Sequence, residues 1–353
     1  MCNTAVFLGE ELAKYGFGES HPFNSDRMYA FESKFYKMNL DKFKQVKVIK
    51  PTIAKEKDLV QFHDKDYVEL VKKLSKKGIG NLDLGDTPAF KEVYEASCYV
   101  VGTTLKAMEL VMEKTEGIIH AFNPIGGLHH ATRGSAGGFC VFNDIGIAIM
   151  DARKRYKINK ICYVDIDAHH GNGVYYEFED DPFVFIADIH EDGHYLYPGT
   201  GSELEIGKGE ANGTKMNIPL KPYSTDEDFI GAFKKVEEFV DNIAKPDLII
   251  LQCGSDGIVG DPLTHLKYSP MTHRYATEKL HHLSHKYCSG KIIALGGGGY
   301  NQTNIANAWT EVIKSFISDI WSITVIIRAE LIFSKRNHHL TIVNSLYKQF
   351  HCL

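Results

Sequence analysis

Five short apolar segments constrain the fold of this chain most strongly. Each is rich in β-branched residues, nearly continuous in hydrophobicity, and bounded by glycine, proline or polar residues. They are "GIIHAF" (117–122), "KICYVDID" (160–167), "FVFIADIH" (183–190), "PDLIILQCGSD" (246–256) and "KIIALGGGGY" (291–300). Strands that are buried on both faces have this pattern, which is typical of a parallel sheet covered by helices.

Amphipathic helical patterns lie between these segments. The clearest spans 226–245, with Thr225 as a suitable N-cap and Pro246 as the residue that stops the pattern. Two further patterns span 58–76 and 91–114. Alternating strands and helices predict crossover units in a doubly wound sheet. No linker or repeat divides the 353 residues, so we expect one α/β domain.

Composition and charge exclude several classes of protein. An apolar fraction of 44% and a charged fraction of 24% are ordinary for a soluble globular protein. The net charge of −5 argues against nucleic-acid binding, which usually leaves a basic footprint. No secretory signal and no apolar run of membrane-spanning length is present. Seven cysteines without a CxxC motif indicate reduced thiols, and we expect a cytoplasmic protein.

Polar side chains follow four of the five predicted strands. Asp165, Asp167 and His169 end the second strand, Asp188 and His190 the third, Asp256 the fourth, and a glycine run with Tyr300 the fifth. In parallel sheets, ligands bind beyond the carboxyl ends of the strands. The sequence therefore predicts a polar site at one edge of the sheet.

A metal centre is the first prediction for this edge. Residues two apart in an extended segment face the same side, so Asp167 and His169 can reach one ion. Adding Asp256 gives three protein ligands and an open position, as in catalytic metal sites. The oxygen-rich set favours Zn²⁺, with Fe²⁺ as the alternative. An acidic turn with a hydrogen-bonded histidine is the simpler interpretation, but it leaves Asp256 unexplained.

Two adjacent histidines supply candidate acid–base groups. His129 and His130 lie in the glycine-rich loop "GLHHATRGSAGGFC" (127–140), at the same edge. One would take a proton from water at the metal, and the other would return one to a leaving amine. Asp165 and Asn172 would bond their outer nitrogens. Because a carboxylate favours imidazolium and an amide does not, the two histidines should differ in pKa.

Other histidines receive no catalytic role. The adjacent pair His281 and His282 lies on an amphipathic helical pattern, and we expect both on the surface. His170 should pack beside the strand end.

The segment "LGGGGYNQ" (295–302) lacks the spacing of a dinucleotide-binding loop. Its glycines would instead let the backbone pass close to a buried site. Tyr300 would then direct its hydroxyl group to a carbonyl oxygen polarised by the metal, as an oxyanion stabiliser. A flexible loop with a packed tyrosine is the alternative.

Five motifs in order resemble the metal-dependent histone deacetylases, whose superfamily includes acetoin utilization proteins and acetylpolyamine amidohydrolases. They are "HHATRGSAGGFCVFND", "YVDIDAHHGNG", "YPGTG", "QCGSDGIVGDPL" and "LGGGGYN", and "GESHPFNSDR" is most similar to the acetoin utilization branch. The resemblance implies a single-domain arginase–deacetylase fold over 1–317, with a parallel sheet of about eight strands and helices on both faces. Residues 318–353 resemble nothing in the family and form an extension of unassigned role.

The resemblance also implies roles for individual residues. The metal ligands are Asp167, His169 and Asp256; the catalytic residues are His129, His130, Tyr300, Asp165 and Asn172. Gly138, Phe139 and Tyr197 match walls of the acyl-lysine tunnel, Asp86 matches a rim residue that grips the substrate backbone, and Arg27 matches an arginine of the acetate channel. A structural K⁺ ion is expected beside Asp165, although Asp188 stands where many members have serine.

The predicted function is therefore a zinc-dependent deacetylase that hydrolyses the amide of acetyl-lysine with metal-activated water. Its substrate would be an acetylated protein or a small acetylated amine, with acetylpolyamines as the first alternative. A binuclear ureohydrolase and a non-catalytic acyl-lysine-binding module are further alternatives. Metal stoichiometry and an acetyl-lysine assay would separate them. The oligomeric state stays open.

Overall fold

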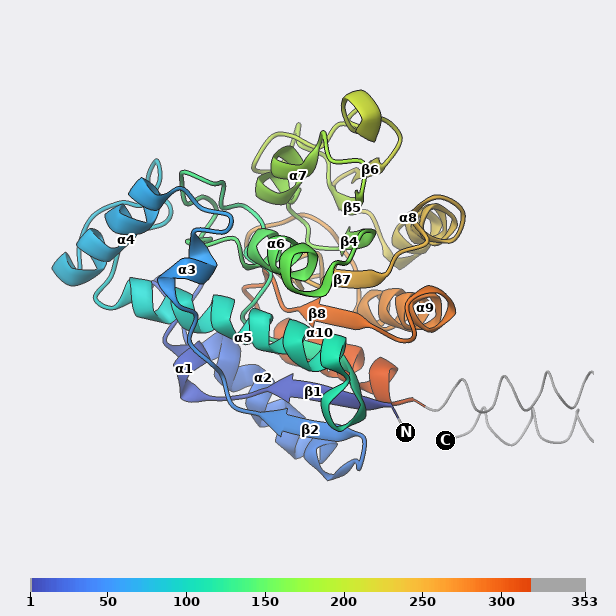
Figure 1. Cartoon of the computed structure of the whole chain (residues 1–353), viewed down its shortest axis with the longest axis horizontal. Helices are drawn as coiled ribbons and strands as arrows, with labels where there is room; N and C mark the ends of the chain where they lie inside the picture. Colours follow the sequence, from blue (N-terminus) through green and yellow to red (C-terminus); the bar gives the residue numbers. More distant parts are fainter. Residues whose placement is uncertain (1, 319–353) are drawn as a thin grey trace, which may run out of the picture. The chain divides into compact units, whose positions relative to one another are not determined.

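A computed structural model describes residues 2–318 of the chain. Within them, one parallel sheet of eight strands has the order β2-β1-β3-β8-β7-β4-β5-β6 (Figure 1). The strands are β1 (Asn3–Phe7), β2 (Val46–Ile49), β3 (Ile118–Asn123), β4 (Ile161–Asp165), β5 (Val184–Glu191), β6 (Lys215–Leu220), β7 (Leu248–Gln252) and β8 (Ile292–Leu295). The predicted fold class is confirmed.

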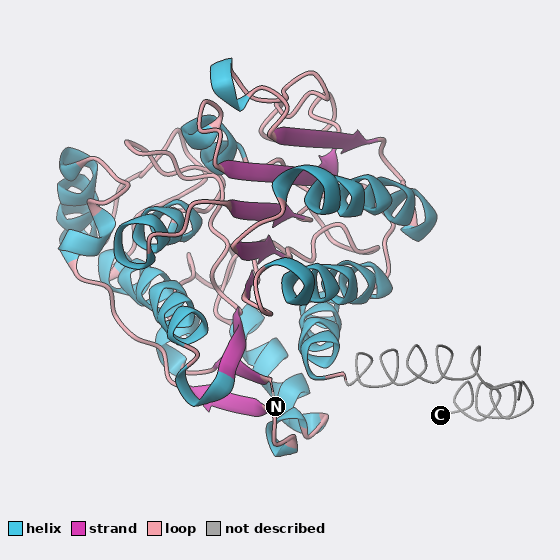
Figure 2. Ribbon diagram, turned by 45° about the vertical axis from the view of Figure 1, so that its right-hand side comes forward, coloured by secondary structure: helices cyan, strands magenta, loops and turns pink. Residues whose placement is uncertain are grey.

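Helices cover both faces of this sheet (Figure 2). They are α1 (Glu10–Ala13), α2 (Asp26–Lys37), α3 (Glu56–Leu59), α4 (Lys65–Lys77), α5 (Val93–Glu113), α6 (Asp144–Tyr156), α7 (Asn172–Phe178), α8 (Asp226–Phe239), α9 (Met271–Tyr287) and α10 (Gln302–Ile317). Short 3₁₀ turns occupy Leu40–Lys42, Thr115–Gly117 and Gly209–Ala211, and a π-turn at Val240–Ala244 extends α8.

Packing assigns the helices to two layers. On one face α5 contacts α6 and α6 contacts α7, while on the other α8 contacts α9. Phe31 of α2 and Trp309 of α10 meet on this second face, with ring centroids 5.7 Å apart. Trp309 is fully buried and also donates a hydrogen bond to the Cys253 carbonyl over 3.1 Å. The sheet is therefore enclosed on both sides, as its apolar strands predict.

Strands β1, β2 and β6 were not predicted, and the position of β2 and β6 in the sheet explains why these two were missed. The five predicted segments contain β3, β4, β5, β7 and β8. Strands β2 and β6 form the two edges of the sheet and have partly exposed residues. An edge strand lacks the continuous apolar run that marks a central strand, so it gives a weak sequence signal.

The single helix predicted for 58–76 is wrong. The chain forms α3 and α4 there, with a break between them. His63 in this break accepts a hydrogen bond at Nε2 from the Asn143 backbone over 2.9 Å, and its Nδ1 lies 3.2 Å from the Arg133 carbonyl oxygen. These contacts come from residues far along the chain, which a local pattern does not reveal.

Tertiary contacts divide the chain after Phe316, where its first compact unit ends. Every strand of the sheet lies in the first unit. The predicted extension, apart from Ser318, falls outside the described residues, and the boundary at 317 stays a prediction. No helix of the described part is both long and apolar enough to cross a bilayer.

Candidate metal centre and active site

Four neighbouring strands bring the site together. Strands β3, β8, β7 and β4 lie side by side in the middle of the sheet, although the chain visits β4 before β7 and β8. Because all four are parallel, the loops that follow them meet at one edge. Six of the eight residues predicted as metal ligands or catalytic groups lie in these loops; Asp165 is the last residue of β4, and Asn172 is the first residue of α7.

The three predicted metal ligands face one another. The Nδ1 atom of His169 lies 3.1 Å from Asp167 Oδ1 and 3.0 Å from Asp256 Oδ2. One ligand atom from each residue lies within 4.8 Å of the other two, and all three residues are buried. The distant "GSD" segment is thus brought to the tip of β4, as predicted.

Neighbouring donors hold the carboxylates in place. Asp167 Oδ2 accepts hydrogen bonds from the Gly298 backbone over 2.7 Å and from Gln252 Nε2 over 2.8 Å. Asp256 Oδ1 accepts one from the Ala168 backbone over 2.8 Å. The remaining oxygen of each carboxylate is directed at His169 Nδ1, so the donor set converges on one point.

The electrostatics of this group fit a divalent cation. Burial and the adjacent Asp167 raise the pKa of Asp256 to about 7. Burial alone would lower the pKa of His169, but both carboxylates outweigh it and raise that pKa to about 10. A cation would screen the repulsion between the carboxylates and take the place of the proton on Nδ1. Two oxygen donors and one imidazole nitrogen form a suitable ligand set.

The paired histidines have the different partners that the sequence predicts. His129 Nδ1 lies 2.7 Å from Asp165 Oδ2, and His130 Nδ1 lies 2.6 Å from Asn172 Oδ1. The two Nε2 atoms are 3.1 Å apart. Since an amide oxygen only accepts, His130 carries a proton on Nδ1 and has its lone pair on Nε2.

Their pKa values move in opposite directions. Burial would lower the pKa of His129, but Asp165 and Asp167 raise it to about 9. Burial lowers the pKa of His130 well below its ordinary value, and the charges of His129 and His169 lower it further. At neutral pH the pair therefore combines one charged and one neutral imidazole, so one member can donate a proton and the other can accept one.

Two supporting residues were missed by the sequence analysis. Tyr163 donates a short hydrogen bond to Asp165 Oδ2, the oxygen that faces His129. Tyr163 precedes Asp165 by two positions on β4, so the strand period predicts a shared side. Gln252, the last residue of β7, contacts Asp167. A glutamine at the end of an apolar strand was the sequence signal that could have identified Gln252 as a residue of the site.

Tyr300 lies at the same site. It lines a narrow cavity of about 10 Å³ together with His129, His130, Asp167 and His169. Burial raises the pKa of its hydroxyl group well above the ordinary value, and the charges of Asp256 and Asp167 add to this. The hydroxyl group therefore keeps its proton at neutral pH and can donate a hydrogen bond.

The glycine run before Tyr300 has a steric cause. A Cβ atom at Gly298 would lie 2.7 Å from Asp167 Oδ2, at the metal ligands. Gly138 is similarly confined on the opposite loop, where its φ is +50° and a Cβ atom would lie 2.9 Å from His130 Cγ. These loops approach the site so closely that only glycine fits.

The predicted tunnel residues surround the cavity. Gly138 lines it, and the half-exposed Tyr197 ring lies 5.1 Å from the His130 ring. The Phe139 ring lies 5.7 Å from that of Tyr300. Phe139 has a left-handed φ of 67°, held by a hydrogen bond of 2.7 Å from the Tyr15 hydroxyl group to its carbonyl oxygen. A fixed aromatic wall thus stands beside the reactive groups.

Asp86 is exposed on the loop after α4. Its carboxylate accepts a hydrogen bond of 3.1 Å from Thr87 Oγ1, and the same oxygen of Thr87 accepts one of 3.0 Å from the Phe139 backbone. Asp83 accepts three backbone hydrogen bonds from residues 85–87, which shapes this loop. The loop is therefore anchored directly to the tunnel wall.

Arg27 reaches the site from α2. Its guanidinium group is buried and donates hydrogen bonds to the carbonyl oxygens of Gly299, over 2.8 Å, and Gly297. It stacks on Phe23 at 3.8 Å and lies 5.8 Å from the Tyr300 ring. Its Nη1 is buried without a hydrogen-bond partner among residues 2–318. A buried donor of this kind is suited to an anion.

Two predictions about other histidines had different outcomes. His170 packs beside the strand end, with Nδ1 2.8 Å from Thr200 Oγ1 and its ring 4.9 Å from that of His190. The prediction that His281 lies on the surface is wrong, because only 4% of it is exposed. His282 is exposed, as predicted. Adjacent residues on a helix point in different directions, so one can be buried while the next is exposed to solvent.

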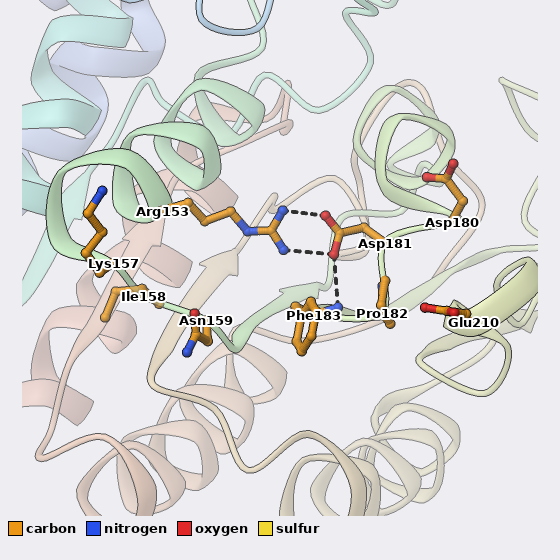
Figure 3. Close-up of a pocket in the computed structure, with 9 residues that line it drawn as sticks. All are labelled: Arg153, Lys157, Ile158, Asn159, Asp180, Asp181, Pro182, Phe183 and Glu210. Carbon is orange, nitrogen blue, oxygen red and sulfur yellow. Dashed lines mark hydrogen bonds and ion pairs between the residues drawn. The ribbon is translucent and has the colours of Figure 1, made fainter.

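A second hollow lies at the opposite edge of the sheet, before β4 and β5 (Figure 3). Its volume is about 610 Å³. Arg153 and Asp181 form a two-bond ion pair across it, with Arg153 Nη2 donating to Asp181 Oδ1 over 2.8 Å. Lys157, Asp180 and Glu210 also line this hollow, and none of its lining residues belongs to the predicted site.

Comparison with known proteins identifies the family of this chain independently of the site geometry. Residues 21–316 match the model of the histone deacetylase domain. The acetoin utilization protein AcuC of Bacillus subtilis (strain 168) is 39% identical over 320 residues, covering 88% of this chain and 81% of the relative. AcuC of Staphylococcus aureus (strain COL) is 34% identical over 325 residues, covering 89% and 82%.

A solved structure agrees. The crystal structure of the HDA15 HD domain superposes with a TM-score of 0.81 at 27% identity, covering 89% of this chain and 88% of that domain. The chain belongs to the histone deacetylase family and is a hydrolase, a deacetylase similar to the acetoin utilization proteins.

Proposed function

We propose that the chain hydrolyses the amide bond of acetyl-lysine side chains with Zn²⁺ held by Asp167, His169 and Asp256. The observation that carries this proposal is the pair of histidines with different hydrogen-bond partners, a carboxylate for His129 and an amide for His130, beside that ligand set. Amide hydrolysis requires a base for the attacking water and an acid for the leaving amine. His130 and His129 would fill these two roles.

The proton path follows from the hydrogen bonds. His130 is neutral, with its lone pair on Nε2, so this atom accepts the proton of the attacking water. Asn172 keeps the proton on Nδ1 and so keeps Nε2 basic. His129 remains protonated because Asp165 stabilises its charge, and it donates to the nitrogen of the departing lysine. Tyr163 fixes the carboxylate of Asp165 for this task.

Charge that develops on the amide oxygen also needs a donor. The bound metal supplies a Lewis acid for this oxygen and for water. The protonated hydroxyl group of Tyr300 donates a hydrogen bond to the same oxygen, and its raised pKa keeps the proton in place. The small cavity limits the water around these groups, which strengthens each interaction.

Binding and release use the surrounding residues. Gly138 leaves room for the lysine methylene chain, and Phe139 and Tyr197 form its apolar walls. Asp86 binds the backbone amides of the substrate at the rim. Arg27 receives the acetate product through its unpartnered Nη1 atom. Main-chain carbonyl groups together with the buried carboxylate of Asp165 would hold a structural K⁺ ion behind the site.

Acetylpolyamines are the second candidate substrates. One specific feature favours them, since Asp83 and Asp86 place two carboxylates on the rim loop beside Tyr197. An acidic rim attracts a polycation as well as a basic peptide. Both substrate classes would present the same amide to the same reactive groups.

One experiment separates these options. The purified, zinc-loaded chain is assayed with an acetyl-lysine peptide, N-acetylputrescine and acetylspermidine, and kcat/KM is compared. We expect the peptide to be the best substrate, chelation to abolish turnover, and Zn²⁺ to restore it. If the acetylpolyamines have the higher kcat/KM, they, and not acetyl-lysine, are the preferred substrates. No turnover of any acetylated amine by the metal-loaded chain would contradict the proposal.

A further inference from the structure

Three histidines meet near the amino ends of the strands, on the side of the sheet opposite to the active site. His120 lies on β3 beside Ile292, the first residue of β8, and His281 and His285 lie on α9. One ring nitrogen from each histidine lies within 4.8 Å of the other two. The Nε2 atoms of His281 and His285 are 3.0 Å apart, and the His120 ring is 4.5 Å from that of His281.

The spacing of these residues is that of a metal site. Residues four apart on a helix lie on one face, so His281 and His285 both point from α9 to the same place. His120 approaches from the strand below. Two imidazoles from one helix and a third from another element are a known three-histidine ligand arrangement for zinc.

A hydrogen bond orients one of the three rings, and a stacking contact orients another. His281 Nδ1 donates to the Ser315 carbonyl oxygen over 3.0 Å, which leaves the lone pair on Nε2, inside the cluster. Metal-binding histidines commonly have such a carbonyl partner on the outer nitrogen. The His120 ring is stacked on Phe316, with centroids 5.1 Å apart and an interplanar angle of 14°.

One nitrogen in the cluster lacks a partner. His120 is fully buried, and its Nε2 atom has no hydrogen bond within residues 2–318. Plain packing of neutral histidines would explain the contact of His281 with His285, but it leaves this atom unsatisfied. Buried polar atoms without partners are rare in native proteins, and a bound ion is one of their recognised causes.

Charge also suits metal binding. The pKa of His120 is lowered by burial and then by the two other histidines. Burial, followed by His285, lowers the pKa of His281 to about 4, and burial lowers the pKa of His285. All three rings are therefore neutral at pH 7, in the form that binds a metal. The half-buried His285 leaves a path for the ion to enter.

We propose that His120, His281 and His285 bind a second Zn²⁺ ion, which ties β3 to α9 and is independent of the catalytic metal. Neutral imidazole nitrogens favour zinc among the common divalent metals, with Cu²⁺ and Ni²⁺ as competitors. No fourth histidine, cysteine or carboxylate joins the group within the described chain, so water completes a tetrahedral shell.

Metal content tests this directly. The full chain is loaded with Zn²⁺, dialysed, and measured by mass spectrometry of the metal. We expect two ions per chain in the natural protein, one in His285→Gln and one in Asp167→Ala/His169→Ala. His285→Gln should keep its deacetylase activity. His282→Gln, an exposed neighbour on the same helix, is the matched control and should keep both ions.

A second measurement avoids dependence on one variant. Co²⁺ is titrated into Asp167→Ala/His169→Ala, where only the proposed site remains. We expect one equivalent with the absorption of tetrahedral Co²⁺, a first shell of imidazole nitrogens by X-ray absorption, and a higher melting temperature. One ion in the natural chain together with no Co²⁺ binding in this variant would overturn the proposal. Carboxylate ligands in the first shell would overturn it as well.

Discussion

Two histidine clusters at opposite edges of one sheet use the same side chain for different chemistry. At the carboxyl edge, His129 pairs with Asp165 and His130 pairs with Asn172. At the amino edge, His120 and His281 are also buried, but their ring nitrogens contact the Thr4 hydroxyl group, the Ser315 carbonyl oxygen and the His285 ring instead of a carboxylate. Burial lowers an imidazole pKa at both edges, and only a carboxylate reverses this.

The comparison explains why burial alone does not identify a catalytic histidine. His129 acquires a pKa of about 9 and His281 one of about 4, although both are nearly inaccessible. An acid–base pair needs two different neighbours, whereas a metal site built from three histidines needs neutral rings. The partners on the outer nitrogens therefore decide which chemistry a cluster can perform.

The largest effect is expected from His130→Ala, which removes the proposed base. The kcat for an acetyl-lysine peptide should fall roughly a hundred- to ten-thousand-fold. Bound zinc should stay at the natural level, because His130 is not a ligand. A loss of zinc together with activity would contradict this separation of roles.

Tyr300→Phe tests the oxyanion donor. We expect kcat to fall roughly a hundred- to thousand-fold, with KM nearly unchanged, because the hydroxyl group acts mainly in the transition state. Steady-state kinetics on the zinc-loaded variant measure both constants. A large increase in KM at constant kcat would instead make Tyr300 a substrate-binding residue.

His63 extends the comparison to a buried histidine that lies in neither cluster. Burial lowers its pKa from 6.5 to about 4. The unfolded chain therefore binds a proton that the folded chain excludes, so stability is complete above pH 6.5 and falls toward pH 4. The loss should reach about 3 kcal/mol.

Denaturant unfolding at pH 7, 5.5 and 4.5 measures this loss. His63→Gln keeps an acceptor but does not titrate, so its free energy of unfolding should depend less steeply on pH. Equal slopes in the natural chain and the variant would show that His63 is not the group responsible.

Asn172→Asp gives the smallest expected change and tests the comparison most finely. A carboxylate at this position would stabilise the charged form of His130 and raise its pKa. The basic form would then appear only at higher pH, and the acidic limb of the kcat/KM profile should move up by about one pH unit. If the pH profile does not move, His130 is not the base whose pKa sets the acidic limb.

Much of this protein could be predicted before its structure was seen. Central strands carry long apolar runs, so β3, β4, β5, β7 and β8 were found, whereas the edge strands β2 and β6 were not. The metal ligands Asp167 and His169 follow from the two-residue period of an extended segment. The break at His63 could not be found, since its bonds to Arg133 and Asn143 are made across the fold.

The sequence by itself determined the sheet, the residue types at its carboxyl edge and the resemblance to one family, because these depend on local periodicity and on ordered motifs. Only the tertiary structure decided which side chains meet. It placed Gln252 behind the site, buried His281, and joined His120 to α9. Such contacts arise when crossover connections bring distant strands and helices together, and no local pattern along the chain contains that distance.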